Sequence, residues 1–416
     1  MKKAITMGLA ALMTVAGIAG AVTVSAAEAV DMSGMKVGFI FLHDENSTYD
    51  LNFINAAKQA AENLGLTEDQ IVLKTNIPEG QECYDTAAEL ADEGCNIVFA
   101  DSFGHEGFLI EAAGEFPEVQ FCHATGTRAH TEGLDNYHNA FASIYEGRYL
   151  AGIAAGMKLN AMIEEGKITA EEAKIGYVGA YTYAEVISGY TSFFLGARSQ
   201  CPSATMEVTF TGSWYDETAE KEAANKLIES GCVLISQHAD SMGAPTACEN
   251  AGVPNVSYNG STISVGPNTY IISSRIDWTP YFEEIITKTA AGEAIDADYT
   301  GTIESGSVVL TELNGDVAAE GTDAAIEEAK AAIVAGELQV YDVSTFTVTV
   351  TEDSNQNATV DADGHLTSYM ADVDTDPAYE GDTEVVIDGY FHESEYRSAP
   401  YFDLKIDGIT LLDESF

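Results

Sequence analysis

The sequence predicts an α/β protein made of two similar units, each a parallel sheet covered by helices on both faces. Residues 36–41 and 174–179 are similar apolar segments that begin 138 residues apart, at Lys36 and Lys174. The pattern Leu-x-x-x-Gly-Cys of residues 90–98 recurs in residues 227–235, which begin 137 positions later. Because both pairs keep the same order and nearly the same spacing, they indicate two copies of one unit. Apolar strand-like segments also alternate with helical ones, which is typical of parallel sheets buried on both faces.

The first unit reads as strands separated by amphipathic helices. Strands are predicted at the apolar segments 36–42, 70–75, 96–100 and 119–124. Helices are predicted at 50–64, at 82–93 and in a third segment that ends near residue 116, before Pro117. Gly65 and Gly94 stand directly after the first two helices, where glycine can adopt the left-handed conformation that ends a helix.

The second unit repeats this order. Its predicted strands are 174–179, 206–211, 232–236 and 256–258, and its predicted helices are 185–199, 216–230 and 242–251. A helix at 145–158 crosses between the units, and a strand at 271–276 followed by a helix at 280–291 leads back. We therefore expect one lobe from residues 34–140 plus 270–300 and a second from 141–269 plus 301–344. Residues 345–416 are rich in Thr, Asp and Val, and are predicted to form a small β-rich C-terminal extension.

The N-terminus predicts export. Lys2 and Lys3 precede an apolar run over residues 4–24, and small residues at 25–27 offer a cleavage site. This pattern is typical of a secretory signal peptide covering residues 1–27, with an uncleaved membrane anchor as the alternative. We expect an extracytoplasmic protein, in the periplasm or at the cell surface.

The net charge excludes several partners. The chain has 18 Lys and Arg against 67 Asp and Glu, which gives a net charge of −49. Binding to nucleic acid or to an anionic membrane needs clustered cations, so neither partner is expected. The charge suits a soluble protein, which we expect to be a monomer, that takes a neutral or weakly charged ligand.

The cysteines are expected to be mostly free thiols. The chain has six cysteines and no Cys-x-x-Cys pair, which argues against a zinc or redox site. Several lie in apolar, strand-like contexts, where cysteine often serves as a small buried residue. No cysteine follows the signal peptide closely, so the usual residue for attachment of a bacterial lipid anchor is absent.

The motifs of common enzymes are missing. The sequence has no Gly-x-Ser-x-Gly, His-Glu-x-x-His or phosphate-binding loop, so no catalytic residue and no cofactor is predicted. His238 and Asp240 could form half of an acid–base pair, but polar binding residues are the preferred interpretation. Asp361 and Asp363 lack the other ligands of a calcium loop and are interpreted as a turn, so no metal site is predicted.

Aromatic and polar residues recur where the predicted strands end. The carboxyl ends of parallel strands are where such sheets bind ligands, and two sheets joined by a hinge would face each other across a cleft. Aromatic faces hold flat apolar rings, whereas carboxylates and amides hold hydroxyl groups and ring nitrogens. The candidate ligand-binding residues are Tyr49, Asp50, Asn52, Phe103, Tyr181, Trp214, His238, Asp240, Asn259 and Trp278.

At these positions the sequence resembles the basic membrane protein family of substrate-binding proteins for ABC transporters. The resemblance covers about residues 36–345. It rests on Phe103-Gly104, on Asn139 through Gly152, on Gly212-Ser213-Trp214-Tyr215-Asp216, on residues 235–241 and on the serine-rich segment before Trp278. Residues 389–403 also resemble extended members of one branch of the family.

The resemblance implies a two-lobed fold of the periplasmic-binding-protein type I class that closes on a purine nucleoside or nucleobase. Phe103, Trp214 or Trp278 would stack the base. The polar candidates would take the ring edges and the ribose; these are Tyr49, Asp50, Asn52, His238, Asp240 and Asn259. Trp278 stands where some members carry Lys, and the first loop lacks the Asn-Asp run of nucleoside-binding members. A free base therefore stays open beside a nucleoside.

These features together predict a protein that captures a purine nucleoside or nucleobase and delivers it to an ABC transporter permease. Two alternatives stay open. One is a sensor that presents its ligand-bound form to a signalling partner. The other is an enzyme that processes nucleosides on a similar two-lobed fold.

Overall fold

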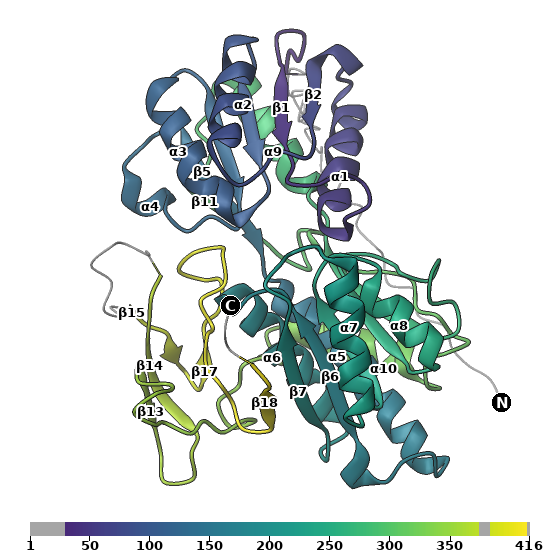
Figure 1. Cartoon of the computed structure of the whole chain (residues 1–416). Coiled ribbons are helices and arrows are strands. Elements are labelled where there is room, and N and C mark those ends of the chain that lie inside the picture. Colours follow the sequence, from purple (N-terminus) through teal and green to yellow (C-terminus); the bar gives the residue numbers. More distant parts are fainter. Residues whose placement is uncertain (1–29, 374–382, 414–416) are drawn as a thin grey trace, which may run out of the picture.

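The computed structural model describes residues 30–373 and 383–413, which form two lobes joined by three crossings of the chain (Figure 1). The N-terminal segment 1–27, expected to be a signal peptide, lies outside the described residues. Among the described residues, none of the helices is both long and apolar enough to cross a bilayer.

The first lobe contains a six-stranded, all-parallel sheet in the order β11-β5-β4-β3-β1-β2. Its strands are β1 (Val37–Ile40), β2 (Ile71–Lys74), β3 (Ile97–Ala100), β4 (Gln120–Ala124), β5 (Tyr137–Ala142) and β11 (Asp298–Gly301). Its helices are α1 (Thr48–Leu64), α2 (Gln81–Asp92), α3 (Glu106–Glu115), the short α4 (Ala129–Glu132) and α9 (Thr279–Ala291).

Successive residues of a strand point to opposite faces, and both faces of this sheet are covered. Phe39 packs with α1 and α9 on one face, whereas Ile40 packs with α2 and α3 on the other. The predicted helix stop at Gly65 is confirmed: Gly65 has φ 70° and its N–H reaches back to the last turn of α1. The continuous apolar strands of the sequence follow from this two-sided burial.

The second lobe contains a seven-stranded sheet in the order β12-β10-β9-β8-β6-β7-β18. Its strands are β6 (Lys174–Gly179), β7 (Thr205–Phe210), β8 (Leu234–His238), β9 (Asn255–Tyr258), β10 (Tyr270–Ile276), β12 (Val308–Leu310) and β18 (Ile409–Leu411). Its helices are α5 (Ile144–Glu164), α6 (Ala184–Gln200), α7 (Glu217–Glu229), α8 (Gly243–Ala251) and α10 (Thr322–Val334). The two sheets confirm the predicted fold class, with parallel pairing throughout except for β10 with β12.

Glycines allow α5 and α6 to pack almost backbone to backbone. A Cβ atom at Gly152 would lie 2.1 Å from the carbonyl oxygen of Phe193, and one at Gly196 would lie 2.0 Å from that of Tyr149. Any larger residue at either position would push the helices apart. The crossing helix α5 is therefore fixed firmly to the second lobe.

One lobe assignment made from the sequence is wrong. Residues 270–300 were expected in the first lobe, but β10 pairs with β9 and β12 in the sheet of the second lobe. The chain crosses back only after β10, at the start of α9. The apolar pattern of a strand shows that it is buried but not in which sheet, and this explains the error.

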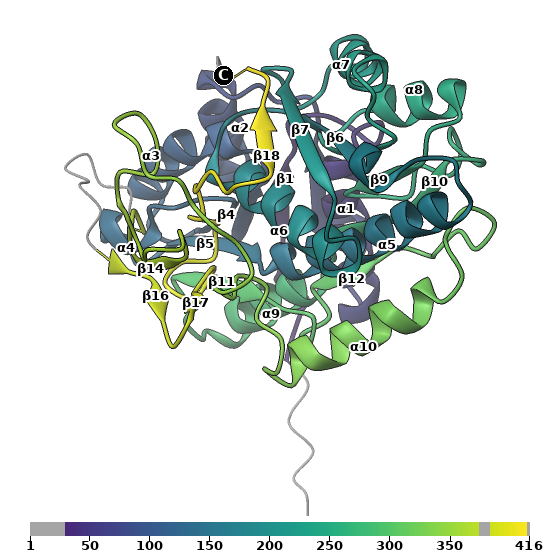
Figure 2. The same ribbon diagram turned by 90° about the horizontal axis from the view of Figure 1, so that it is seen from below.

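The C-terminal extension is less separate than the sequence suggested. It forms an antiparallel sheet of β13 (Ala358–Val360), β14 (Leu366–Ala371) and β15 (Thr383–Glu384), and a two-stranded ladder of β16 (Val386–Ile387) and β17 (Tyr390–Phe391). Its last strand, β18, pairs in parallel with β7 and so completes the sheet of the second lobe (Figure 2). Tyr341 stacks on Phe402 with ring centroids 4.3 Å apart, inside the core of that lobe.

All six cysteines are free and buried, as expected from their apolar contexts. Burial raises the pKa of the Cys83, Cys122 and Cys248 thiols to about 12. The reactive thiolate therefore becomes scarcer, by about tenfold for each unit of pKa. We expect a thiol titration of the denatured, unreduced protein to find six groups, and the native protein to react far more slowly. Two or fewer groups in the denatured protein would contradict this assignment.

Candidate functional site

A cavity lies between the lobes, where loops from the carboxyl ends of the strands meet. The free space among its lining residues is about 360 Å³, including the part that is open to solvent. The first lobe contributes the loop after β1, the first turn of α1 and the ends of β3 and β4, and the second lobe contributes the ends of β7, β8 and β9 and the start of α6. The lining residues are Leu42, His43, Tyr49, Asp50, Ser102, Phe103, Thr125, Glu185, Trp214, His238, Asp240 and Asn259.

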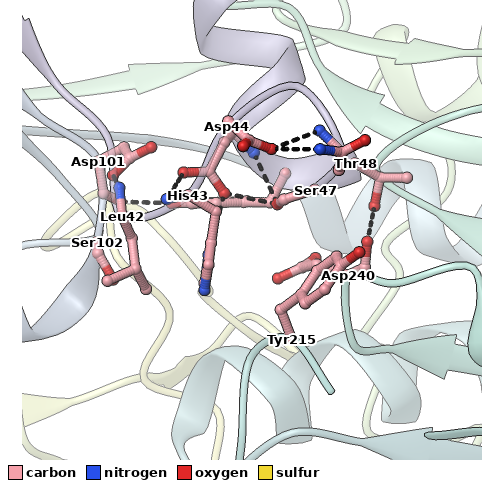
Figure 3. A network of polar contacts seen from close by, with 12 residues as sticks. Leu42, His43, Asp44, Ser47, Thr48, Asp101, Ser102, Tyr215 and Asp240 are labelled. Atoms are coloured by element: carbon pink, nitrogen blue, oxygen red, sulfur yellow. Dashed lines mark hydrogen bonds and ion pairs between the residues drawn. The ribbon is translucent and has the colours of Figure 1, made fainter. Parts of the chain in front are cut away.

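The lobes touch each other directly beside this cavity. The N–H and the hydroxyl of Thr48 in the first lobe both donate to the carbonyl oxygen of Asp240 in the second, each at 3.1 Å (Figure 3). The amide of Asn52 donates to the carbonyl oxygen of Asn259 at 2.7 Å. These interlobe hydrogen bonds indicate a closed arrangement, in which a ligand would be held between both lobes.

Aromatic side chains gather along the same edge of the cavity. Phe103 of the first lobe stacks on Tyr183 of the second, with ring centroids 4.9 Å apart. Tyr183 in turn stacks on Tyr181, and Trp214 stands edge-on to Tyr181 at 5.0 Å. The cluster thus places one aromatic ring from each lobe, Phe103 and Trp214, on the lining of the cavity.

A pair of buried carboxyl groups supports the first-lobe wall. Asp50 accepts hydrogen bonds from the N–H of His43 at 2.7 Å and from the hydroxyl of Ser47 at 2.5 Å. Burial opposes its charge, but the hydrogen bonds from His43 and Ser47 outweigh burial and lower the pKa of Asp50. Burial and then the nearby Asp50 charge raise the pKa of Asp101 well above its usual range. Asp50 is therefore the charged member of this pair.

The second-lobe wall presents a buried acid next to an amide. Asp240 is 5% exposed, and its carboxyl group accepts from the side-chain amide of Asn259 at 2.8 Å. Burial raises the pKa of Asp240 well above its ordinary value, and this outweighs the opposing hydrogen bond from Asn259. The raised pKa favours the neutral carboxyl group, which can both donate to a ligand and accept from it.

His238 and Glu185 form a second polar pair on this wall. Nε2 of His238 lies 3.5 Å from a carboxylate oxygen of Glu185, and its Nδ1 lies 3.5 Å from the hydroxyl of Tyr177. Burial lowers the pKa of His238, which favours the neutral imidazole. The buried Arg148 donates to the hydroxyls of Tyr177 and Ser236. Through Tyr177 it contacts His238 indirectly.

Seven of the ten candidate residues from the sequence meet around the cavity. These are Tyr49, Asp50, Phe103, Trp214, His238, Asp240 and Asn259. Tyr181 contacts the Trp214 ring edge-on and is absent from the lining, and Asn52 forms the interlobe hydrogen bond described above. The role of these residues in binding a ligand stays a prediction.

Trp278 is not in the cleft, which corrects the expectation from the sequence. It is 2% exposed, and its ring stacks on Phe53 at 4.5 Å in the core of the first lobe. Trp278 follows a strand, as cleft residues do, but the chain crosses between the lobes at this point. The side chain therefore enters the packing between α1, α9 and the first sheet.

The sequence analysis missed five lining residues: Leu42, His43, Ser102, Thr125 and Glu185. Four of them lie within three residues after the end of β1, β3 or β4, where the rule that selects the carboxyl ends of parallel strands applies. Thr125 also has φ 66°, an uncommon conformation for a β-branched residue that often marks functional sites. Glu185 lies in the first turn of α6 and has no such signal in the sequence.

Residues 40–344 match the model of a family described as the PnrA-like substrate-binding proteins of ABC transporters. The chain belongs to this family. Its members bind substrates for transport and are not enzymes. The match confirms the resemblance found in the sequence, and it ends before the C-terminal extension.

Two named relatives agree with the assignment of the chain to this family. The chain is 34% identical over 260 residues to a Haloferax volcanii protein named as an ABC transporter glucose-binding protein, a match that covers 62% of this chain and 62% of that one. It is 31% identical over 273 residues to a purine-binding protein of Brucella abortus, covering 65% and 72% of the two chains. The match thus spans less than two thirds of the Haloferax protein.

Solved structures agree on the fold. An ABC transporter solute-binding protein from Aeropyrum pernix K1 has a TM-score of 0.63 at 17% identity, covering 77% of this chain and 95% of that one. One from Conexibacter woesei has a TM-score of 0.58 at 20% identity, covering 73% and 98%. This family member therefore has the periplasmic-binding-protein type I fold.

Proposed function

We propose that this substrate-binding protein captures a purine nucleobase or nucleoside between its lobes and delivers it to an ABC transporter permease. The observation that supports this most is that one aromatic ring from each lobe, Phe103 and Trp214, lines the same cavity as the buried acid Asp240 and its amide partner Asn259. A flat heterocycle needs both features, because its faces are apolar and its edge carries hydrogen-bonding groups.

Five of the lining residues have a use in this proposal. Phe103 and Trp214 offer ring faces or edges to the base. Asp240 and Asn259 offer donors and acceptors together, which suits a ring edge where nitrogens and carbonyl groups alternate. Asp50 offers a charged acceptor to an N–H or a hydroxyl on the opposite wall. A relative that is named as purine-binding agrees with this choice of ligand.

A sugar is the second candidate ligand. Asp50, Asp240 and Glu185 line one cavity, and carboxyl groups beside aromatic rings also suit the hydroxyls and the apolar face of a sugar. A relative named as glucose-binding favours this reading. The aromatic rings of both lobes favour the purine, because they match a ligand that is flat on both faces.

Mass spectrometry of the small molecules released when the purified protein is denatured would test the proposed function. Calorimetric titration with adenine, guanine, their nucleosides, glucose and galactose should follow. We expect a purine compound to bind with micromolar or tighter affinity and the sugars not to bind. Binding of a sugar alone would overturn the purine assignment and leave the transport role standing.

The place of action is also part of the proposal. Residues 1–27 read as a signal peptide, and proteins of this family typically work outside the cytoplasm. We infer that the protein is exported and acts at the outer side of the membrane that holds the permease.

A sensor that presents its closed form to a signalling partner would use the same cleft. Loss of purine uptake on deletion of the gene would distinguish transport from sensing.

We expect the lobes to separate when the ligand leaves. The contacts of Thr48 with Asp240 and of Asn52 with Asn259 join the lobes beside the cavity, and two further hydrogen bonds join the C-terminal extension to β11, so these contacts must break for the whole cleft to open. A ligand that touches both walls favours the closed state by its differential affinity. Small-angle scattering should therefore show a smaller radius of gyration at saturating ligand. Identical curves with and without bound ligand would indicate a rigid site.

A further inference from the structure

The C-terminal extension is attached firmly to the second lobe. Its last strand, β18, pairs with β7, and Tyr341 stacks on Phe402 in the core of that lobe. The hydroxyl of Tyr341 also donates to the carbonyl oxygen of Ser188 in α6 at 2.8 Å. The extension must therefore move with the second lobe when the lobes move. Because its deletion would expose this core, its role has to be tested with point variants.

One loop of the extension also contacts the first lobe. In Figure 1 the extension lies beside the second lobe, and its yellow loop reaches toward the first lobe. The N–H of Ser398 donates to the carboxylate of Asp298 at 2.9 Å, and the hydroxyl of Thr300 donates to the carbonyl oxygen of Ser394 at 3.2 Å. Asp298 and Thr300 belong to β11, the last strand on its side of the first sheet. We call these two hydrogen bonds the joint.

The loop that forms the joint is held in one shape by Arg397. Its Nε and Nη2 donate to the carbonyl oxygens of Ala399 and Pro400 at 3.1 and 2.9 Å. Its guanidinium group also lies 5.6 Å from the centroid of the Tyr401 ring, and the residue is buried. The loop therefore presents Ser398 to the first lobe from a fixed position.

The joint lies well apart from the interlobe hydrogen bonds made by α1. In the first sheet, β11 is four strands away from β1, the strand that leads into α1. At about 4.8 Å between neighbouring strands, this separation is roughly 19 Å. Residues that follow β1, β3 and β4 line the cavity. The two lobes are thus held together at two distant places along the same edge of the sheet, and the extension provides one of them.

Opening of the lobes would displace the two sides of the joint. After β11, which ends at Gly301, the chain crosses to the second lobe. Asp298 lies three residues before this point, or roughly 10 Å at about 3.3 Å per residue of a strand. A rotation of the first lobe about the crossing therefore moves Asp298 relative to Ser398, which belongs to the second lobe's extension. Thr300 lies closer to the crossing and moves less, so the Asp298 contact opposes opening more.

The joint is also suited to come apart and form again. Oδ1 of Asp298 and the hydroxyl groups of Ser394 and Ser398 are buried without a hydrogen-bond partner among the residues that the structure describes. A buried polar atom without a partner opposes burial, because water would bond to it if it were exposed. When the joint separates, new bonds to water offset the two bonds that are lost. The joint is therefore a reversible contact rather than a permanent brace.

We propose that residues 394–398 act as a strap that limits how far the lobes open when the cleft is empty. The strap stabilises the closed arrangement through the bond between Asp298 and Ser398. A ligand that needs closed lobes then binds more tightly, because a larger fraction of the empty protein is already closed. The strap lies beyond residue 344, where the match to the family model ends. The inference rests on the two-lobed fold and on the joint, whatever the ligand is.

Small-angle scattering of the full chain without ligand tests the strap. Asp298→Ala removes the acceptor of the Ser398 N–H, so we expect its radius of gyration to exceed that of the native protein. Asp298→Asn keeps an oxygen that can accept this bond and should lie closer to the native value. Asp296→Ala is the matched control, because the exposed Asp296 pairs with Lys288 inside the first lobe at 2.9 Å. It should leave the radius of gyration unchanged.

A second control separates the joint from a contact inside the first lobe. Asp298 also lies 3.3 Å from Nε2 of His130. His130→Gln removes this ion pair and leaves the joint intact, so its radius of gyration should stay native. Thr300→Val, which removes the second bond of the joint and suits a strand, should give a smaller increase than Asp298→Ala. It also keeps the test available if Asp298→Ala does not fold, which melting curves of each variant would show.

Calorimetric titration with adenine and adenosine adds a second readout. Asp298 is absent from the lining of the cavity, so any effect on affinity must act through closure of the lobes. A hydrogen bond to a charged group shifts an equilibrium by roughly tenfold. We therefore expect Asp298→Ala to bind these purines up to about tenfold more weakly, and Asp296→Ala to bind them as the native protein does.

The possible outcomes separate the strap from the proposed function. A folded Asp298→Ala with the native radius of gyration would overturn the strap. An equal increase in Asp298→Ala and His130→Gln would also overturn it, because the effect would then arise inside the first lobe. Failure of both purines to bind the native protein would count against the proposed function, and the scattering of the ligand-free variants would still decide the strap.

Discussion

Replacing Trp278 by alanine should lower the free energy of unfolding by about 3–5 kcal/mol, the usual cost of truncating a large buried aromatic residue. Trp278 is 2% exposed and lies among Phe53, Phe99 and Phe282, where α1 and α9 meet the first sheet. Its removal would leave a cavity that these rings cannot fill without moving. Because a domain is typically stable by only about 5–15 kcal/mol, the loss should be plain in urea unfolding followed by circular dichroism.

Ligand titration of the same variant gives the control. The fraction of Trp278→Ala that remains folded should bind its ligand with nearly native affinity, because the side chain is absent from the lining of the cavity. A variant with native stability but much weaker binding would contradict the placement of Trp278 in the core and return it to the cleft.

Replacing Trp214 by alanine should have the opposite profile, with a large loss of affinity and a smaller loss of stability. Trp214 is half-buried and lines the cavity, and stacking of a base on an aromatic side chain is worth about 1–3 kcal/mol. We therefore expect purine binding to weaken roughly 5- to 150-fold in calorimetric titration, at about 1.4 kcal/mol for each tenfold change.

Trp214→Phe is the matched control, because it keeps an aromatic face in the same place. It should retain most of the affinity that Trp214→Ala loses. If Trp214→Ala instead melts at a lower temperature and binds as tightly as the native protein, Trp214 only packs its loop against Tyr181, and the base is stacked elsewhere.

The two tryptophans show what a local sequence pattern can predict about a side chain and what it cannot. Both follow a predicted strand, and both were expected in the cleft for that reason. Trp214 follows β7 and stays at the carboxyl edge of its own sheet, so the rule holds there. Trp278 follows β10 at a crossing between lobes, so its side chain enters the core of the other lobe. Where the chain crosses between the lobes depends on how the whole chain packs. The residues around the crossing therefore carry no local pattern that predicts it.

The C-terminal extension shows the same limit. Its Thr- and Asp-rich composition predicted short strands and turns, and these are present. Composition could not indicate that β18 would join β7, nor that Ser398 would donate a hydrogen bond to Asp298 of the first lobe. These contacts join residues that lie 100 positions or more apart in the chain, and no local pattern encodes such a pairing.

The sequence by itself determined the parts of this protein that depend on local periodicity and on repetition. The apolar strands, the helix stop at Gly65 and the spacing of the two units were enough to predict two parallel sheets and a binding cleft at their carboxyl edges. Only the tertiary structure decided which sheet β10 joins, which tryptophan lines the cavity and how the extension packs against both lobes. The physical reason is that burial constrains a residue's polarity locally, whereas the identity of its neighbours depends on where distant segments pack.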